Sequence, residues 1–382
     1  MAETNVPGSI GNNAEKKGTP DSVNRRGFLR ATGNVFKKGA ISALLLGNAG
    51  YPEPEEPLDP MINRLASDRI PGATKPLEVL RVPGAMRGVI HIGQQHVVSD
   101  RQILRHGARQ TEEDLRVTER SQRNVESVIL HLKSMYGLRG VQLEGTTPAI
   151  IDRLLRLRDT YRRVVREHRE EIERRRRTSP HPQGNTMDAL QIRTIEARHM
   201  REYLRGAAQI GLDQAMEFTR LQDLLSEFQT AAHEEILCLR DHPDDRAQQA
   251  PLRQRREERE AAFLRQADRL WYRFQGAAIK LHFEGKIDLY PIASDAFHRE
   301  NERRIENAQG TEQRRAIFDE REDEAVRMAT TTMNNERVPF VATVLGDDHR
   351  FDGGPHDDNN ISKWNSGHPR EKIWLARIDT AL

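Results

Sequence analysis

The chain has 382 residues, 31% of them charged, and a net charge of only +2. Because proteins that bind nucleic acid usually draw affinity from an excess of basic residues, this balance argues against a nucleic-acid partner. The single cysteine, Cys238, excludes an intrachain disulfide and any metal site built from several cysteines. The mean hydropathy of −0.77 predicts a small core that is supplemented by long amphipathic helices.

The first 50 residues contain a paired-arginine motif. At 24–30 the sequence is Asn-Arg-Arg-Gly-Phe-Leu-Arg, and a weakly apolar stretch follows at 40–46. That stretch is far shorter than the about 20 apolar residues that a membrane-spanning helix needs. The motif resembles the twin-arginine export signal. The resemblance implies that residues 1–50 are a signal region that is read by the twin-arginine translocation machinery.

The same resemblance implies export across the cytoplasmic membrane, to the periplasm or to the outside of the cell. The twin-arginine machinery carries folded cargo, so an exported chain without disulfides is consistent with it. The alternative interpretation of this region is a basic, disordered tail. Residues 51–76, which begin with a run rich in Pro and Glu, are predicted to form a flexible linker. No later stretch is long and apolar enough to predict a stable membrane anchor.

Residues 77–148 are expected to form the first half of an α/β sheet domain. Two β-type runs, 77–82 and 88–93, flank a turn-rich connector and predict a hairpin. A helix is predicted over 111–135, with a threonine cap and acidic residues in its first turn, and a strand over 140–144. Strand, helix and strand in this order are typical of the βαβ unit of a parallel sheet.

From 149 to 311 the sequence predicts an antiparallel helical insertion. Apolar residues recur there at intervals of three and four positions, as they do on one face of a helix. Helices are expected over 151–177, 188–205, 213–240, 252–283 and 294–307. Pro251 is placed at the first turn of the fourth helix. The aromatic residues Trp271, Tyr272 and Phe274 near the end of that helix either cap the core or line a ligand groove.

Residues 312–382 are expected to form the second half of the sheet domain. A helix over 311–333, an apolar β-type run over 341–346 and a final strand over 372–378 are predicted there. The predicted fold is therefore mixed α/β, with a small central sheet that is split by a long, mostly helical insertion.

Two apolar runs that lie far apart in the chain both end in Gly-x-x-His. His96 ends the first run and His349 the second, and Glu144 stands at the end of the strand between them. Ligands of open α/β sheets collect beyond the carboxyl ends of the strands, so we expect these three side chains in one crevice. Two histidines and a carboxylate suit a divalent metal ion or acid–base catalysis. Each motif alone is more typical of a turn glycine followed by a solvated histidine.

Together with Arg321, which lies in the predicted late helix, these motifs resemble the pattern shared by Tiki-type and TraB-type proteins, the ChaN haem-binding lipoproteins and the erythromycin esterases. The resemblance covers 77–145 and 316–382. In that family asparagine often follows the arginine, whereas here Glu322 follows it. The sequence therefore does not decide whether Glu322 takes the role of that asparagine.

The resemblance implies an exported, metal-dependent hydrolase that acts on a peptide or a small molecule, as a peptidase or an esterase. His96, Glu144 and His349 would hold a divalent metal ion and lower the pKa of its bound water. Arg321 would stabilise the oxyanion or orient Glu144. In a metal-free variant, similar to the erythromycin esterases, one histidine deprotonates water directly while a carboxylate fixes its tautomer.

Two other functions stay open at this point. The first is a non-catalytic protein of the ChaN type that binds haem or another ligand, although an aromatic content of 5% offers little for a flat apolar pocket. The second is a scaffold whose site has decayed. Glu322 and the two aspartates of the second motif, Asp347 and Asp348, favour this reading, although the aspartates would equally suit a metal ion.

Overall fold

The computed structural model describes residues 58–95, 112–178, 181, 183–207, 212–346, 349, 351 and 360–381. All of them belong to one compact unit, which comprises residues 56–382. The predicted signal region at 1–50 and the predicted ligand His96 lie outside the described residues.

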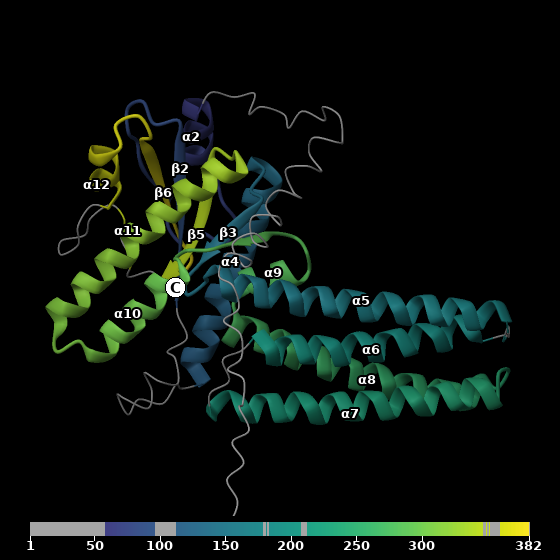
Figure 1. The fold of residues 1–382 in the computed structure, drawn as a ribbon. Helices are drawn as coiled ribbons and strands as arrows, with labels where there is room; N and C mark the ends of the chain where they lie inside the picture. The colour runs from purple at the N-terminus through teal and green to yellow at the C-terminus, as the bar shows by residue number, and fades with distance from the viewer. Residues whose placement is uncertain are drawn as a thin grey trace, which may run out of the picture. The chain divides into compact units, whose positions relative to one another are not determined.

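A six-stranded mixed sheet lies at the centre of this unit (Figure 1). Its strands are β1 (Glu78–Leu80), β2 (Arg87–Gln94), β3 (Gly140–Leu143), β4 (Asp288–Tyr290), β5 (Phe340–Gly346) and β6 (Ile373–Asp379). In space they follow the order β1-β6-β2-β5-β3-β4, and every neighbouring pair is parallel except β1 with β6. The carboxyl ends of β2, β3 and β5 therefore meet at one edge. The predicted mixed α/β class is confirmed.

The predicted hairpin between the first two strands is wrong. β1 pairs antiparallel with β6, where Val79 lies opposite Ala376, whereas β2 lies parallel between β5 and β6. The residues of β2 after Arg87 are all buried, so this strand needs a neighbour on each side and helices on both faces. The residues of β1 are exposed or half-buried, which suits a short edge strand.

Three elements lie where the sequence predicted none. β4 belongs to the range 149–311 that was predicted as helical insertion, and it pairs with β3 as the last strand of the sheet. The helix α2 (Leu58–Ser67) lies within the predicted linker, and α12 (Asn360–Gly367) lies between β5 and β6.

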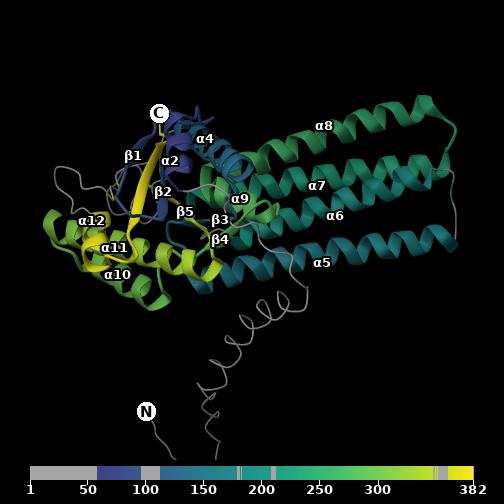
Figure 2. The ribbon, with the colours of Figure 1, turned by 90° about the horizontal axis from the view of Figure 1, so that it is seen from above.

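Helices cover both faces of the sheet. α4 (Glu112–Tyr136) matches the predicted helix over 111–135, and its buried side chains pack with Ile90 and Ile92 of β2. On the opposite face, α11 (Thr311–Glu336) packs against Val89 of the same strand. Figure 2 shows the sheet between these two helices. β2 thus contributes to a core on each face.

Four long helices extend from the sheet domain (Figures 1 and 2). They are α5 (Pro148–Thr178), α6 (Gly184–Ala207), α7 (Leu212–Asp241) and α8 (Arg246–Leu270), and each packs against the next. α8 begins before the predicted position because Asp245 caps it, accepting hydrogen bonds from two backbone N–H groups. Pro251 is therefore inside the helix and not in its first turn.

The predicted helix over 252–283 is also divided near its end. A π-helical segment, η1 (Trp271–Gln275), follows α8, and Gly276, with φ of 88°, separates it from α9 (Ala277–Phe283). α10 (Asp295–Asn307) begins after Ser294, whose hydroxyl accepts a hydrogen bond from the Phe297 N–H. In the part of the chain that the structure describes, no helix has an apolar stretch long enough to cross a membrane.

Candidate functional site

The carboxyl ends of β3 and β5 bring Glu144 close to His349. Glu144 directly follows β3, and its Oε2 accepts a hydrogen bond of 3.3 Å from the N–H of Gly346, the last residue of β5. The N–H of His349 donates to the Gly346 carbonyl at 3.0 Å. The parallel pairing of β3 with β5 is therefore what places the two side chains at the same edge of the sheet.

The His349 imidazole lies between two carboxylates. Its Nδ1 is 2.8 Å from Oε1 of Glu322, and its Nε2 is 3.8 Å from Oε1 of Glu144. The His349 side chain is 12% exposed. Burial by itself would lower its pKa, but the hydrogen bonds and charges of Glu144 and Glu322 outweigh burial and raise the pKa of His349 to about 9. His349 is therefore an imidazolium at neutral pH.

Arg321 completes the group from the side of α11. Its Nη2 donates to Oε1 of Glu144 at 3.3 Å, and its guanidinium carbon lies 5.7 Å from the centre of the Phe318 ring. The hydrogen bond to Glu144 is made by one nitrogen of the guanidinium. Arg321 contributes a positive charge next to the carboxylate of Glu144.

The structure brings together three of the predicted residues, Glu144, Arg321 and His349, whereas His96 lies outside the described residues. Glu322, which was interpreted as a departure from the family pattern, is 4% exposed and holds the His349 ring. A signal for it existed in the sequence. Glu322 shares the buried face of α11 with Ala325, Val326, Ala329 and Met333, and a carboxylate in an apolar stripe needs a partner.

A cavity of about 880 Å³ opens beside these residues. Glu144 and His349 lie at the sheet edge of the cavity, and α10, α11 and η1 supply much of its remaining lining. The α11 wall carries Arg314, Arg315, Phe318, Arg321 and Glu322. A concave site with a few converging polar groups is the usual form of a small-molecule or peptide site.

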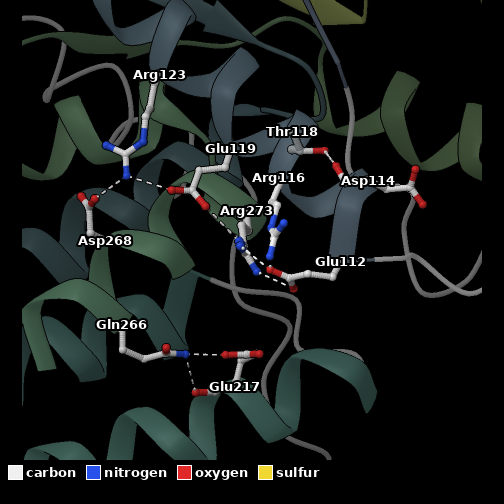
Figure 3. A network of polar contacts seen from close by, with 10 residues as sticks. All are labelled: Glu112, Asp114, Arg116, Thr118, Glu119, Arg123, Glu217, Gln266, Asp268 and Arg273. Atoms are coloured by element: carbon white, nitrogen blue, oxygen red, sulfur yellow. Dashed lines mark hydrogen bonds and ion pairs between the residues drawn. The ribbon is translucent and has the colours of Figure 1, made fainter. Parts of the chain in front are cut away.

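The π-helical segment η1 is anchored to α4 by a buried arginine (Figure 3). Arg273 donates to both carboxylate oxygens of Glu112, at 3.0 and 3.1 Å, and to Glu119 at 3.0 Å. Arg123 extends this network by bonding to Glu119 at 2.9 Å and to Asp268 at 2.7 Å. A π-helical turn shifts the side chains that follow it, and such turns are frequent at functional sites.

The two interpretations of the aromatic cluster overlap. Trp271, 4% exposed, and Tyr272, 3% exposed, both belong to the core, and Tyr272 also lines the cavity together with Phe274. The opposite side of this wall is fixed by Gln122, whose Nε2 donates to Gln94 at 2.6 Å and whose Oε1 accepts from the Ala277 N–H at 2.9 Å. This part of the cavity wall is thus held by a residue with defined partners.

The described residues do not make a complete metal site. Among them no group of three or more His, Cys, Asp or Glu side chains could hold an ion. Oε1 of Glu144 and Nε2 of His349 are 3.8 Å apart. Two ligands of one ion with bonds near 2.1 Å lie about 3 to 3.5 Å apart. Both oxygens of Glu144 also face hydrogen-bond donors, Arg321 and Gly346.

Haem fits the described lining less well. It needs an axial ligand and a flat apolar pocket. His349 turns both ring nitrogens towards carboxylates, and the cavity wall carries charged residues of both signs, such as Arg314 and Glu302.

Comparison of the chain with protein-family models, with curated proteins and with solved structures gives no match. The resemblance to the Tiki, TraB, ChaN and erythromycin esterase group therefore stays a prediction, and the chemistry of the site has to be argued from its own geometry.

Proposed function

We propose that the protein is a hydrolase of a peptide or an ester, with Glu144 as the base and His349 as the acid. The observation that carries the proposal is the His349 imidazole, which lies between the carboxylates of Glu322 and Glu144 at the end of a cavity of about 880 Å³. Pairs of titratable groups with different protonation states are the usual basis of acid–base catalysis. Here the pair is a carboxylate and an imidazolium.

The pKa of His349, about 9, decides the roles. An imidazolium cannot accept a proton from water, so the histidine-as-base scheme suggested by the erythromycin esterases does not suit this site. Glu144 instead takes a proton from a water molecule as the water oxygen bonds to the substrate carbonyl carbon. His349 then gives its Nε2 proton to the departing amine or alkoxide as the bond to the carbonyl carbon breaks. The proton that Glu144 took from water then moves to Nε2 of His349, which restores the imidazolium and the carboxylate.

Two neighbours support this scheme. Glu322 bonds to Nδ1 of His349, so the Nε2–H is directed towards Glu144 and the cavity. Arg321, with its guanidinium next to Glu144, is placed to stabilise the negative charge on the carbonyl oxygen during attack. Arg321 and Glu322, the charged neighbours of Glu144 and His349, therefore each have a role in one reaction.

Metal-dependent hydrolysis is the second candidate, because one observation favours it. Histidines that ligate a metal usually donate their other ring N–H to a carboxylate, and Glu322 holds Nδ1 of His349 in that way. His96 would then be the third ligand beside Glu144 and His349. This candidate predicts bound metal and loss of activity with a chelator, whereas the acid–base scheme predicts neither.

The test is hydrolysis of a panel of peptides and esters by the wild-type protein and by Glu144→Gln, His349→Gln and His168→Ala. General acid–base groups contribute about 100-fold or more to rate, so the first two variants should lose at least that factor. His168 is exposed on α5, with its Nδ1 facing the Val164 carbonyl, and its replacement should leave the rate unchanged.

Metal content per chain and activity after dialysis against a chelator are measured on the same samples. Activity that survives the chelator supports the acid–base scheme. Activity that disappears and returns with a divalent ion supports the metal-dependent scheme. No hydrolysis of any substrate by the wild-type protein, or full activity of both site variants, would contradict the proposed function.

A further inference from the structure

We infer that the substrate is a short peptide with an apolar side chain just after the cleaved bond. Its free carboxylate lies about 10 Å from that bond, which is the rise of seven residues along a helix. The inference rests on the proposed function, because it names the substrate class of the same site. It is carried by three exposed side chains of α11 that line the cavity: Arg314, Arg315 and Phe318.

Two positive charges lie near the N-terminal end of α11. Arg314 and Arg315 are exposed, line the cavity and have no ion-pair partner among the described residues. The other two cavity arginines differ, because Arg273 bonds to Glu112 and Glu119 and Arg321 bonds to Glu144. Guanidinium groups bind carboxylates through two parallel hydrogen bonds. The two unpaired arginines are therefore available to bind an anionic part of the substrate.

The second step is an exposed aromatic ring between this charge and the reacting groups. Phe318 is 39% exposed, and its ring centre lies 5.9 Å from that of His349. Phe274 and Ile279 line the same cavity from η1 and α9. An apolar side chain of the substrate would remove these surfaces from water, which stabilises binding in proportion to the apolar area covered.

The third step is the spacing along α11. Arg314, Phe318 and Arg321 follow one another at intervals of four and three residues, so they lie on one stripe of the helix. Seven residues at 1.5 Å each separate the ends of this stripe by about 10 Å. An extended peptide spans about 10 Å with three residues. A peptide with three residues beyond the cleaved bond would therefore place its carboxylate at Arg314.

The fourth step is the orientation. Glu302 of α10 lines the large cavity and also a smaller pocket of about 30 Å³ beside Glu144 and His349. Arg314 and Arg315 line only the large cavity. The smaller pocket is lined by three carboxylates, Glu144, Glu302 and Glu322, and by two cations, Arg321 and His349. Its net negative charge repels a substrate carboxylate at the reacting end, so the anionic end of the substrate is directed outwards to the arginines.

The experiment uses four peptides in which the bond to be cleaved follows the acetylated alanine. The first is Ac-Ala-Phe-Ala-Ala with a free carboxylate, the second is its C-terminal amide, and the third replaces Phe by Ser. The fourth is an amide that ends in phosphoserine, which separates recognition of a phosphate from recognition of a carboxylate. Binding to the full chain is measured by calorimetry, and cleavage is followed separately by mass spectrometry.

We expect the free acid to bind the wild-type protein about tenfold more tightly than the amide, which is the usual contribution of a charged hydrogen-bonded pair. The Arg314→Gln, Arg315→Gln double variant should bind both peptides equally. Phe318→Ser should remove the preference for Phe over Ser. Arg299→Gln, which changes an exposed arginine of α10 outside the cavity lining, is the matched control and should behave as wild type.

Equal binding of acid and amide to the wild-type protein overturns the inference, as does a preference that survives in the double variant. Tighter binding of the phosphoserine amide than of the free acid overturns the assignment of a carboxylate. Failure to bind any of the four peptides also overturns it. Because binding is measured apart from cleavage, selective binding without hydrolysis would contradict the proposed function and leave the substrate-recognition inference supported.

Discussion

Glu322 and His349 form a hydrogen bond of 2.8 Å between a buried carboxylate of α11 and an imidazole that follows β5. The bond connects the helix on one face of the sheet to the edge where the strands end. Glu322 is 4% exposed, and a buried carboxylate is stable only with a partner of opposite charge or with hydrogen-bond donors. The protonated ring of His349 provides both.

The first prediction concerns stability against pH. The pKa of His349 in the folded protein, about 9, is above its ordinary value of 6.5. The stabilisation from this charged ring is therefore fully present below pH 6.5 and is lost as the pH rises through 9. A shift of this size corresponds to about 3 kcal/mol of unfolding free energy. Urea unfolding of the wild-type protein below pH 6.5 and above pH 9 should show this loss.

Glu322→Gln should flatten this dependence, because the neutral amide no longer stabilises the imidazolium. Glu320→Gln is the control on the same helix, since Glu320 pairs with Arg304 and not with His349. A wild-type protein whose stability is constant between these pH values would show that the imidazole is not held in its charged form.

The second prediction concerns the pH dependence of hydrolysis. If His349 is the acid, kcat/KM falls as the free protein loses the imidazolium proton, so activity should decline above pH 9. In Glu322→Gln the decline should begin at lower pH, and lowering the pH should restore the rate. An inactive misfolded protein would not recover. If kcat/KM declines at the same pH in the wild type and in Glu322→Gln, the decline is caused by a group other than His349.

Much of the fold was accessible from the sequence because the signals are local. The apolar runs of β2, β3, β5 and β6 and the periodicity of the long helices depend on neighbouring residues only. The partner of β1 could not be predicted, because Val79 pairs with Ala376 almost 300 residues later. β4 is only three residues long, too short for a recognisable alternation.

The site shows the same division. Glu144 and His349 were predictable because the carboxyl ends of parallel strands meet at one edge of a sheet. The apolar stripe of α11 marks Glu322 as buried, but its partner, His349, depends on how α11 packs against the sheet. The lining of the cavity by Tyr272 and Phe274 depends on the π-helical turn of η1, for which the sequence carries no pattern.

The third prediction concerns export. The paired arginines are the recognition element of the signal that 24–30 resembles, so Arg25→Lys with Arg26→Lys should leave the protein in the cytoplasm at full length and folded. Lys16→Arg with Lys17→Arg, a basic pair outside the motif, is the control and should be exported normally. Cell fractionation followed by immunoblotting measures both. A processed form of the first variant outside the cytoplasm would contradict the twin-arginine assignment.

The fourth prediction concerns the network of Figure 3. Arg273 is buried and bonds to Glu112 and Glu119, whereas Arg116 contacts Glu112 with a side chain that is 62% exposed. Arg273→Ala leaves Glu119, whose side chain is 19% exposed, without its bond to a buried guanidinium, whereas an exposed pair such as Arg116 with Glu112 is worth about 0.5 kcal/mol. Arg273→Ala should therefore lower the unfolding free energy several times more than Arg116→Ala, as measured by urea unfolding.

Arg273→Ala should also weaken ligand binding. Arg273 bonds η1 to α4, and Tyr272 and Phe274 of η1 line the cavity. Arg273→Lys keeps the charge but cannot bond to both oxygens of Glu112, so it should fall between the wild type and Arg273→Ala in stability and in binding of Ac-Ala-Phe-Ala-Ala. Equal stability of Arg273→Ala and Arg116→Ala would mean that the network does not hold η1. A loss of stability without any loss of binding would mean instead that the aromatic wall keeps its position without this anchor.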